Sequence, residues 1–252
     1  MARPFACVAA ALLLTTAPLE AQETASPASA RQSIWLVYGG DHAVSRRLGL
    51  VFDAQLRMTQ NATRERQVLL RPGASFVVSP ALKLSAGYTV TSARDDGTDP
   101  FFTRRPEHRA WVSAQYGHAL GPISLGHRYR AEHRWLPGVR VDDAGMPVGE
   151  TRVTSERMRY SLRATVPLAA RGRGRSMYLA ASDEVFASFG GYAGDMAVDQ
   201  NRVAVVLGMR ASRTLRLEMG YMLQASGSGG RLDERNHTLQ IAAVSTAPLR
   251  GR

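Results

Sequence analysis

The sequence contains very little cysteine and very little lysine. Its 252 residues include one cysteine, Cys7, and one lysine, Lys83. Cys7 lies in a segment that we expect to be removed on export, so the mature chain is predicted to have no disulfide, no thiolate metal site and no cysteine nucleophile. Beyond the amino terminus no apolar run reaches about 18 residues, the length that a membrane-spanning helix needs. Any role in a membrane must therefore use β-strands.

The charge of the chain is one-sided. Lys and Arg number 32 against 21 Asp and Glu, which gives a formal net charge of +11, and nearly all of the positive charge is guanidinium. An apolar content of 44% argues against disorder. The excess charge needs an anionic partner, and nucleic acid is one candidate. We do not favour nucleic acid, because the basic residues alternate with Tyr, Leu and Val that need burial and because the chain is expected to be exported.

The amino terminus has the three-part pattern of a secretory signal peptide. Arg3 precedes the apolar stretch 5–14, and residues 17–21 end in a small residue suited to signal peptidase. The alternative is a buried amino-terminal helix, but the apolar block has the length of a signal core. We expect cleavage after Ala21, which divides the chain into a signal peptide (1–21), a short linker (22–33), a barrel (34–246) and a tail (247–252).

Apolar and polar residues alternate with a period of two through most of the chain. In residues 123–135 the odd positions include Leu125 and Tyr129, whereas the even positions include Arg128 and Arg130. This period indicates β-strands with two different faces, and helices would not produce it. The same pattern marks residues 157–166 and 215–224, and similar alternation occurs at 48–58, 67–78, 82–91, 107–117, 177–186, 200–212 and 236–244.

The lengths of these segments favour a barrel that spans a membrane. Most have about 9 to 13 residues, which is typical of tilted bilayer-spanning strands and longer than the usual soluble strand. We therefore predict an all-β fold, a single antiparallel up-and-down transmembrane β-barrel of about 10 to 12 strands. A shorter candidate strand at 34–40 makes the count eleven, so it is either a periplasmic preface to the barrel or accompanied by a twelfth short strand. Short turns are expected at 79–81, 118–122 and 213–214, and longer loops at 59–66, 92–106, 137–150, 187–199 and 225–233.

If the apolar face meets lipid, the charged face must line a closed lumen. An Arg on the lipid face near the middle of the bilayer costs roughly 2 to 4 kcal/mol, so the strand arginines are expected inside. One interpretation is a structural ladder of carboxylates and guanidinium groups that hydrogen-bond across strands. The other is that arginines outnumber acids, which leaves positive charge to attract a lipopolysaccharide phosphate or an anionic solute. The predicted lumen and anion-binding residues are Arg128, Arg130, Arg134, Arg157, Arg159, Arg163, Arg202, Arg216, Glu132, Glu184 and Glu218.

The sequence offers little support for catalysis or metal binding. A membrane-barrel esterase needs a serine activated by a histidine, which within one strand requires His-x-Ser, and no such pair occurs. Assembly across strands, for example with His237, stays open. His127 and His133 share a face but could hold a metal only with a partner strand. We predict no catalytic residue, no metal site and no cofactor.

Several short runs together resemble a known bacterial family. They are GHRYRAEHR (126–134), RMRYSLR (157–163), DEVF (183–186), DQNR (199–202), GYMLQ (220–224) and the NH pair at Asn236 and His237. Their order and spacing are similar to those of a family of bacterial outer-membrane barrels, the domain of unknown function 2490. The resemblance covers roughly residues 34–244. It implies a β-barrel in the outer membrane of a Gram-negative cell, and it carries no established activity or catalytic residue.

Three functions from different classes are compatible with these patterns. The one we favour is an integral outer-membrane β-barrel with an Arg-rich lumen and no catalysis, acting as a structural protein or a narrow anion-preferring pore. The second is a soluble periplasmic carrier of lipocalin type, which would place apolar side chains inside and arginines in water. The third is an outer-membrane lipid hydrolase. The expected partners are outer-membrane lipids, lipopolysaccharide and the barrel insertion machinery, and no nucleic acid.

Overall fold

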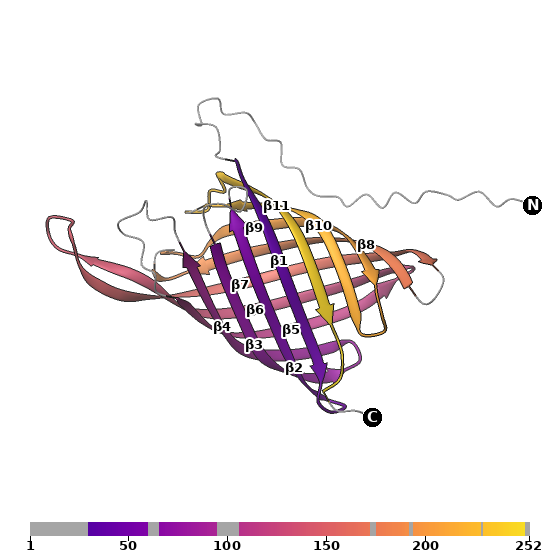
Figure 1. Ribbon diagram of the computed structural model, residues 1–252. Coiled ribbons are helices and arrows are strands. Elements are labelled where there is room, and N and C mark those ends of the chain that lie inside the picture. Colours follow the sequence, from indigo (N-terminus) through magenta and orange to yellow (C-terminus); the bar gives the residue numbers. More distant parts are fainter. Residues whose placement is uncertain are drawn as a thin grey trace, which may run out of the picture.

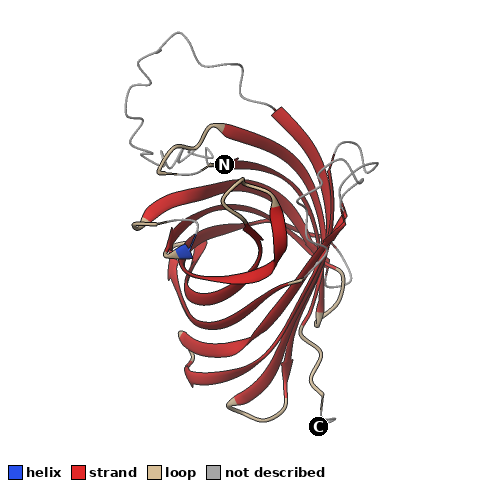
Figure 2. Cartoon of the chain, turned by 90° about the vertical axis from the view of Figure 1, so that its left-hand side faces the viewer, coloured by secondary structure: helices blue, strands red, loops and turns tan. Residues whose placement is uncertain are grey.

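The computed structural model describes residues 30–59, 66–94, 106–171, 175–191, 194–227 and 229–249. Within them the chain forms eleven β-strands and no α-helix, and the strands close into a barrel (Figure 1, Figure 2). No helix in these ranges is long and apolar enough to cross a membrane. The predicted all-β barrel is thereby confirmed. The predicted signal peptide lies outside the described residues.

Each strand is long enough for its side chains to alternate many times between the inside and the outside of the barrel. The shortest strands have 12 residues and the longest has 25. The strands are β1 (Ala30–Ala43), β2 (Leu48–Thr59), β3 (Arg66–Ser79), β4 (Leu82–Arg94), β5 (Glu107–Leu120), β6 (Ile123–Val141), β7 (Pro147–Arg171), β8 (Arg175–Phe189), β9 (Ala197–Arg210), β10 (Leu215–Ser226) and β11 (Glu234–Ser245).

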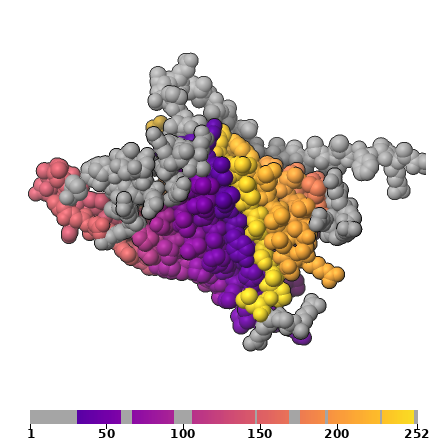
Figure 3. All heavy atoms as spheres, viewed as in Figure 1, coloured from indigo at the N-terminus to yellow at the C-terminus, as the bar shows by residue number. Residues whose placement is uncertain are grey.

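Neighbouring strands of the barrel are antiparallel except at one seam. β1 pairs with β2 on one side and with β11 on the other, and the β1–β11 ladder is parallel from Ala30↔Arg235 to Gly40↔Ser245. Figure 1 shows these two strands running in the same direction, and Figure 3 shows the first and last strands side by side on the surface. An odd number of strands requires such a seam, because the first and last strands of an up-and-down barrel then point the same way.

The predicted short strand at 34–40 is therefore not a separate periplasmic segment before the barrel, and it is not accompanied by a twelfth strand. It is the middle of the 14-residue strand β1, and the described residues contain no twelfth strand. Residues 30–33, which the sequence had suggested were linker, belong to this strand. The polar run at 31–33 and the adjacent Gly39 and Gly40 interrupt the apolar alternation, which explains why the sequence pattern underestimated β1.

The connections between strands fall at two ends of the barrel. We call one the short-turn end, where the connections at 44–47, 80–81, 121–122 and 211–214 lie, and the other the long-loop end, where β2, β4, β6, β8 and β10 end. Short and long connections therefore separate as expected. Gly121 has a positive φ of 57°, which suits the tight β5–β6 turn.

One predicted loop is wrong. Most of residues 137–150 belong to β6 and β7, which form a long hairpin that projects beyond the rest of the barrel (Figure 1). At its tip, Oδ1 of Asp142 accepts hydrogen bonds from the backbone N–H groups of Ala144 and Met146, at 3.0 and 2.8 Å. The Gly and Pro content of this segment suggested a loop, but the β-branched Val139 and Val141 continue the ladder.

The two faces of each strand differ in burial in the sense that membrane barrels require. On β3 the apolar Val68 and Leu70 are each 44% exposed, whereas Leu69 is fully buried and Arg71 is 6% exposed. The same alternation places Arg159 at 7% exposure on β7 and leaves Leu217 exposed on β10. The barrel thus carries apolar side chains outside and charged side chains inside, the reverse of a soluble carrier.

Candidate functional site

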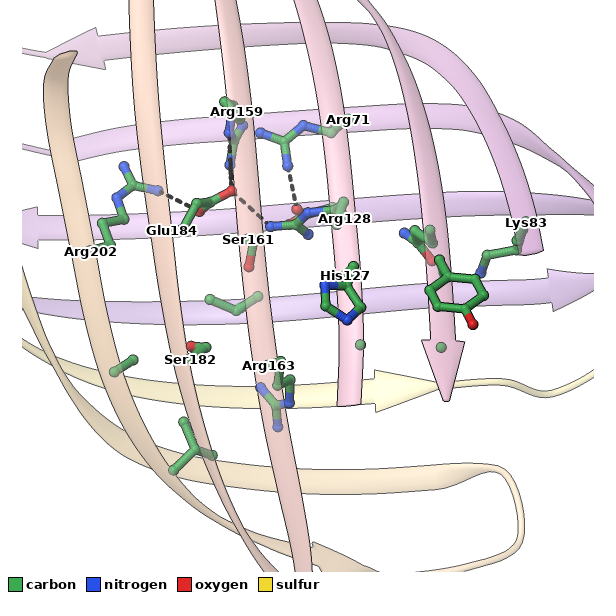
Figure 4. Close-up of a pocket in the computed structure, with 18 of the residues that line it drawn as sticks. Arg71, Lys83, His127, Arg128, Arg159, Ser161, Arg163, Ser182, Glu184 and Arg202 are labelled. Atoms are coloured by element: carbon green, nitrogen blue, oxygen red, sulfur yellow. Dashed lines mark hydrogen bonds and ion pairs between the residues drawn. The ribbon is translucent and has the colours of Figure 1, made fainter. Parts of the chain in front are cut away.

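Glu184, in the middle of β8, lies at the centre of an ion-pair cluster inside the barrel (Figure 4). Its Oε1 accepts hydrogen bonds from Nε and Nη2 of Arg159, at 3.1 and 2.8 Å, and from Nη2 of Arg128 at 2.9 Å. Nη1 of Arg202 lies 3.9 Å from Oε2 of the same carboxylate. One carboxylate therefore faces three guanidinium groups from three different strands, and their positive charge exceeds its own.

Two further carboxylates extend this cluster toward the long-loop end. Nη1 of Arg159 donates to Oε1 of Glu132 at 2.7 Å, and Nη1 of Arg109 lies 3.7 Å from Oε2 of Glu132. Arg109 also donates to both oxygens of Glu107 at 2.8 Å, and Arg134 donates to one of them at 2.6 Å. The predicted residues Glu132, Arg134 and Arg159 are thus brought into one connected network.

The predicted lumen residue Arg157 pairs with Asp199, which simple alternation along β9 would place on the outer face. Nη2 of Arg157 donates to Oδ2 of Asp199 at 2.7 Å, and Nε donates to Oγ of Ser188 at 2.8 Å. Asp199 has the parity of the outward Val203, but the register between β8 and β9 shifts beside it. This bulge turns Asp199 inward, which period-two counting could not foresee.

The remaining predicted residues lie nearer the short-turn end. Nη2 of Arg163 donates to Oε1 of Glu218 at 2.8 Å, and the hydroxyl of Tyr178 donates to the same oxygen at 2.6 Å. Arg216 lines the interior there, and its buried Nε has no hydrogen-bond partner among the described residues.

Lys83 forms an ion pair with Asp41 in the same half of the barrel. Because β4 and β1 are not neighbours in the barrel, this bridge reaches across the interior rather than along the sheet.

Aromatic rings inside the barrel support the guanidinium groups. The guanidinium carbons of Arg57 and Arg202 lie 4.0 and 5.0 Å from the ring centroid of Trp35. Those of Arg159 and Arg202 lie 4.5 and 4.7 Å from the centroid of Phe186. A cation over an aromatic face is attracted by the ring quadrupole. Sequence reasoning missed these rings, although both share the parity of charged residues on their strands.

Two adjoining cavities occupy the interior between the short-turn end and the ion-pair cluster. Their volumes are about 690 and 550 Å³. Eight basic side chains of the described residues line them, against four carboxylates, which are Asp41, Asp53, Glu184 and Glu218. Each of these carboxylates already pairs with a basic group. The arrangement leaves a surplus of positive charge around space that water or a small solute can fill.

The outer wall carries polar rings in two bands. All six histidines of the sequence lie on it, each beside an aromatic ring. The pairs near the short-turn end are Tyr38–His42, Tyr116–His118 and His127–Tyr160, and those near the long-loop end are Tyr88–His108, His133–Trp135 and Tyr221–His237.

The separation of the two bands matches the thickness of a membrane. On β5, His108 and His118 are ten residues apart, and the outward residues between them are uncharged. A rise of about 3.4 Å per residue and a tilt of 35 to 45° give roughly 24 to 28 Å along the barrel axis. Outer-membrane barrels have an apolar band about 25 Å tall with aromatic girdles at both edges. An outward carboxylate, Asp183, lies between the bands on β8 and accepts a hydrogen bond of 2.6 Å from Nδ2 of Asn201.

The histidines do not form the catalytic or metal-binding arrangements considered from sequence. Nδ1 of His237 lies 2.5 Å from the hydroxyl of Tyr221, and Nδ1 of His127 lies 2.9 Å from that of Tyr160. His133 pairs with Glu156 on β7, and no third potential ligand among the described residues joins this pair. Among the described residues no three potential metal ligands of the His, Cys, Asp and Glu types come together.

The short runs that resembled a known family meet in space. They occupy consecutive strands from β6 to β11, and inward residues of all six lie in a row across the sheet that steps from Gln200 to Arg202 on β9. The outermost links join Nε of Arg202 to Oε1 of Gln224 at 3.0 Å and Oγ of Ser33 to Oδ1 of Asn236 at 2.9 Å. The cross-strand pairs are Arg130↔Arg159, Arg159↔Phe186, Phe186↔Gln200, Arg202↔Gln224 and Gln224↔Asn236.

These features define a closed β-barrel with a charged interior and an apolar outer wall. The chain belongs to the family described as protein of unknown function (DUF2490), whose model matches residues 32–235, so the expected family is confirmed. No sequence among the curated proteins matches the chain.

Two solved structures match the chain. One is the NanC porin, with 12% identity and a TM-score of 0.49, covering 82% of this chain and 89% of the porin chain. The other is the siderophore receptor PirA from Pseudomonas aeruginosa, with 10% identity and a TM-score of 0.31, covering 73% of this chain and 33% of the receptor.

Proposed function

We propose that the protein is an integral β-barrel of a Gram-negative outer membrane that does not act as an enzyme and whose basic interior favours anions. The observation that carries this proposal is the opposite chemistry of the two faces. An exposed apolar belt surrounds the barrel, whereas the guanidinium groups and carboxylates point inward. In hydrocarbon such a belt costs nothing, and closure of the sheet satisfies the backbone groups. In water it would expose a large apolar surface that soluble proteins avoid.

The alternative functions find less support in the same contacts. A soluble carrier of lipocalin type needs an apolar interior, but the cavities here are lined by ion pairs. A lipid hydrolase needs a histidine beside a serine, and the described hydrogen bonds of His237 and His127 go to tyrosines.

The size of the interior favours a narrow path over an open channel. Barrels with about 8 strands are filled by side chains, and those with about 16 to 18 leave an aqueous channel. With eleven strands, the ion-pair cluster around Glu184 fills the middle while cavities remain on the short-turn side. Any conduction is therefore expected to be small. The surplus of basic over acidic groups at the cavities would make it anion-preferring.

Membrane insertion can be tested separately from conduction. The mature protein should fractionate with outer membranes and migrate faster on gels before heating than after it, because a closed barrel resists unfolding by the gel detergent. Folded into vesicles of brominated phospholipid, it should lose Trp135 fluorescence, since this ring belongs to the outer band. A Trp135→Phe variant is the matched control, and equal quenching of the two proteins would contradict the placement. Release into the soluble periplasm without detergent would favour the carrier.

Conduction and its selectivity can be tested in planar bilayers. Under a KCl gradient the reversal potential should have the sign of chloride permeation. Arg163→Gln should reduce this preference without loss of the barrel, because Tyr178 continues to donate to Glu218. Cation preference would refute the anion assignment, and absence of conductance would leave a structural barrel.

On this proposal, outer-membrane phospholipid and lipopolysaccharide surround the apolar belt. The barrel insertion machinery would place the protein there after removal of the signal peptide. The long-loop end would face the outside of the cell and the short-turn end the periplasm, as in other outer-membrane barrels.

A further inference from the structure

Arg130, near the middle of β6, is a buried cation with unpaired hydrogen-bond donors. The residue is 7% exposed, yet its Nε and Nη1 have no hydrogen-bond partner among the described residues. Its neighbours on the inner face, Arg71, Arg128 and Arg159, each donate to a carboxylate. A buried charge that lacks a partner is strongly destabilising. The hydrogen-bonding capacity of this guanidinium group is therefore unused by the described residues.

The position of Arg130 is fixed by an aromatic platform. Its guanidinium carbon lies 4.5 Å from the ring centroid of Trp111. The indole itself lies against Gly73 and Gly87, which face each other on β3 and β4. A Cβ at either glycine would come within 2.8 Å of the indole. The space that holds the indole, which we call the Trp111 slot, therefore exists only because both glycines lack a side chain. The guanidinium group therefore lies over Trp111 at the wall of the 550 Å³ cavity.

The charges around Arg130 do not compensate it. It interacts unfavourably with Arg71, Arg128 and Arg159 and favourably with one carboxylate, Glu132. That carboxylate already accepts a hydrogen bond from Arg159 at 2.7 Å. Its other oxygen, Oε2, has no hydrogen-bond partner among the described residues, so it does not satisfy the unpaired nitrogens of Arg130.

A second arginine with an unpartnered nitrogen, Arg216, lines the same cavity. Nε of Arg216 is buried and has no hydrogen-bond partner in the described part of the chain. The carboxylates at this cavity include Glu218, which pairs with Arg163, and Asp53, which pairs with Arg71. Two separate arginines at the wall of one cavity thus have nitrogens that form no hydrogen bond with the described residues. Desolvated guanidinium groups are the usual protein ligands of phosphate and carboxylate oxygens.

We propose that this cavity is a binding site for one small oxyanion, a phosphate or carboxylate group, held by Arg130 and Arg216. The site rests on the proposed barrel with a basic interior, but it does not require conduction. A volume of about 550 Å³ admits inorganic phosphate or a small organic acid and excludes a polymer. The same group could arrive as a free solute or as part of a lipid headgroup, and the two sources are distinguished below.

The test uses the mature full-length protein, folded in detergent and checked by its heat-modifiable migration. Isothermal titration calorimetry with inorganic phosphate at constant ionic strength should detect binding to one site. Arg130→Gln should weaken phosphate binding at least tenfold, whereas Arg213→Gln, in the exposed β9–β10 turn, should leave it unchanged. Equal binding by the Arg130 variant would overturn the proposal, as would equal binding of chloride.

A second measurement keeps the site testable if the Arg130 variant does not fold. Phosphate should change the tryptophan fluorescence of the wild-type protein, and Trp111→Phe should remove that change. No fluorescence change, or an unaltered change in the Trp111 variant, would overturn the proposal.

A water-soluble phosphate monoester should compete with inorganic phosphate if the natural source is a free solute. If only vesicles that contain anionic lipid compete, the source is a headgroup. Failure of conduction in planar bilayers would refute the pore but not this site, whereas failure of phosphate binding would refute the site and leave the barrel in place.

Discussion

Glu184→Gln should destabilise the barrel by about 3 to 5 kcal/mol, the range found when one partner of a buried ion pair is removed. The carboxylate accepts three hydrogen bonds from Arg159 and Arg128, and each hydrogen bond to a charged group contributes about 1.5 to 3 kcal/mol. The glutamine amide keeps one acceptor oxygen but no charge. Three guanidinium groups, including that of Arg202, would then repel one another in an interior where water screens them poorly.

The assay is urea unfolding of the protein folded in detergent micelles, followed by tryptophan fluorescence. The slope of the unfolding free energy against urea should stay constant, so that a lower midpoint reports lower stability. The matched control is Asp143→Asn, which removes an exposed carboxylate at the tip of the β6–β7 hairpin. We expect this control to change stability by no more than about 0.5 kcal/mol.

A loss below about 1 kcal/mol for Glu184→Gln would refute the reasoning, since surface ion pairs have values of that size. It would mean that the cluster is hydrated enough for water to replace the carboxylate. A second readout comes from bilayers. If the barrel conducts, the same variant should shift the reversal potential toward stronger anion preference, because it removes a negative charge from the cavity wall.

Three other changes probe the slot, the outer wall and the hairpin. Gly87→Ala should lower the unfolding free energy by about 1 to 3 kcal/mol through overpacking, because its Cβ would lie 2.3 Å from a carbonyl oxygen. The control Gly117→Ala introduces only ordinary contacts and should be neutral. Equal urea midpoints for the two variants would contradict this prediction. Asp183→Leu combined with Asn201→Val should leave the unfolding free energy unchanged or raise it by about 1 to 4 kcal/mol, as replacing buried polar pairs by apolar residues often does. Urea unfolding in vesicles measures this change, and a lower unfolding free energy for the double variant would contradict the prediction. Replacing residues 139–149 by a two-residue turn should preserve heat-modifiable migration, and a variant that no longer folds would show that the hairpin supports the barrel.

The inward and outward faces of the barrel were predictable because they depend only on the two-residue alternation of side chains along a single strand. Alternation assigns Arg128 and Tyr129 to opposite sides without any knowledge of the partner strand. Membrane lipid then decides which side is inside, since a guanidinium group in hydrocarbon is costly. The same rule explains why the arginines of the central parts of β6 and β7 lie on the inner face.

Features that depend on the partner strand were not predictable in this way. The parallel β1–β11 seam follows from the total strand count, to which the weakly patterned β1 contributes. Asp199 faces inward only because of a bulge opposite β8. The slot for Trp111 requires Gly73 and Gly87 to be in register on two strands, and one sequence does not specify register. The ion pairs require distances between strands that sequence spacing cannot supply.

The unpaired guanidinium of Arg130 connects the stability of the barrel to its occupancy. A ligand that binds only the folded state stabilises it by RT ln(1 + [L]/Kd), which is about 2.7 kcal/mol at one hundred times Kd. If the cost of burying Arg130 is offset by an oxyanion, phosphate should raise the urea midpoint of the wild-type protein. It should raise the midpoint of Arg130→Gln much less, and that variant should be the more stable protein when no oxyanion is present. If Arg130 belonged to a balanced structural network, Arg130→Gln would instead be less stable than the wild-type protein at every phosphate concentration.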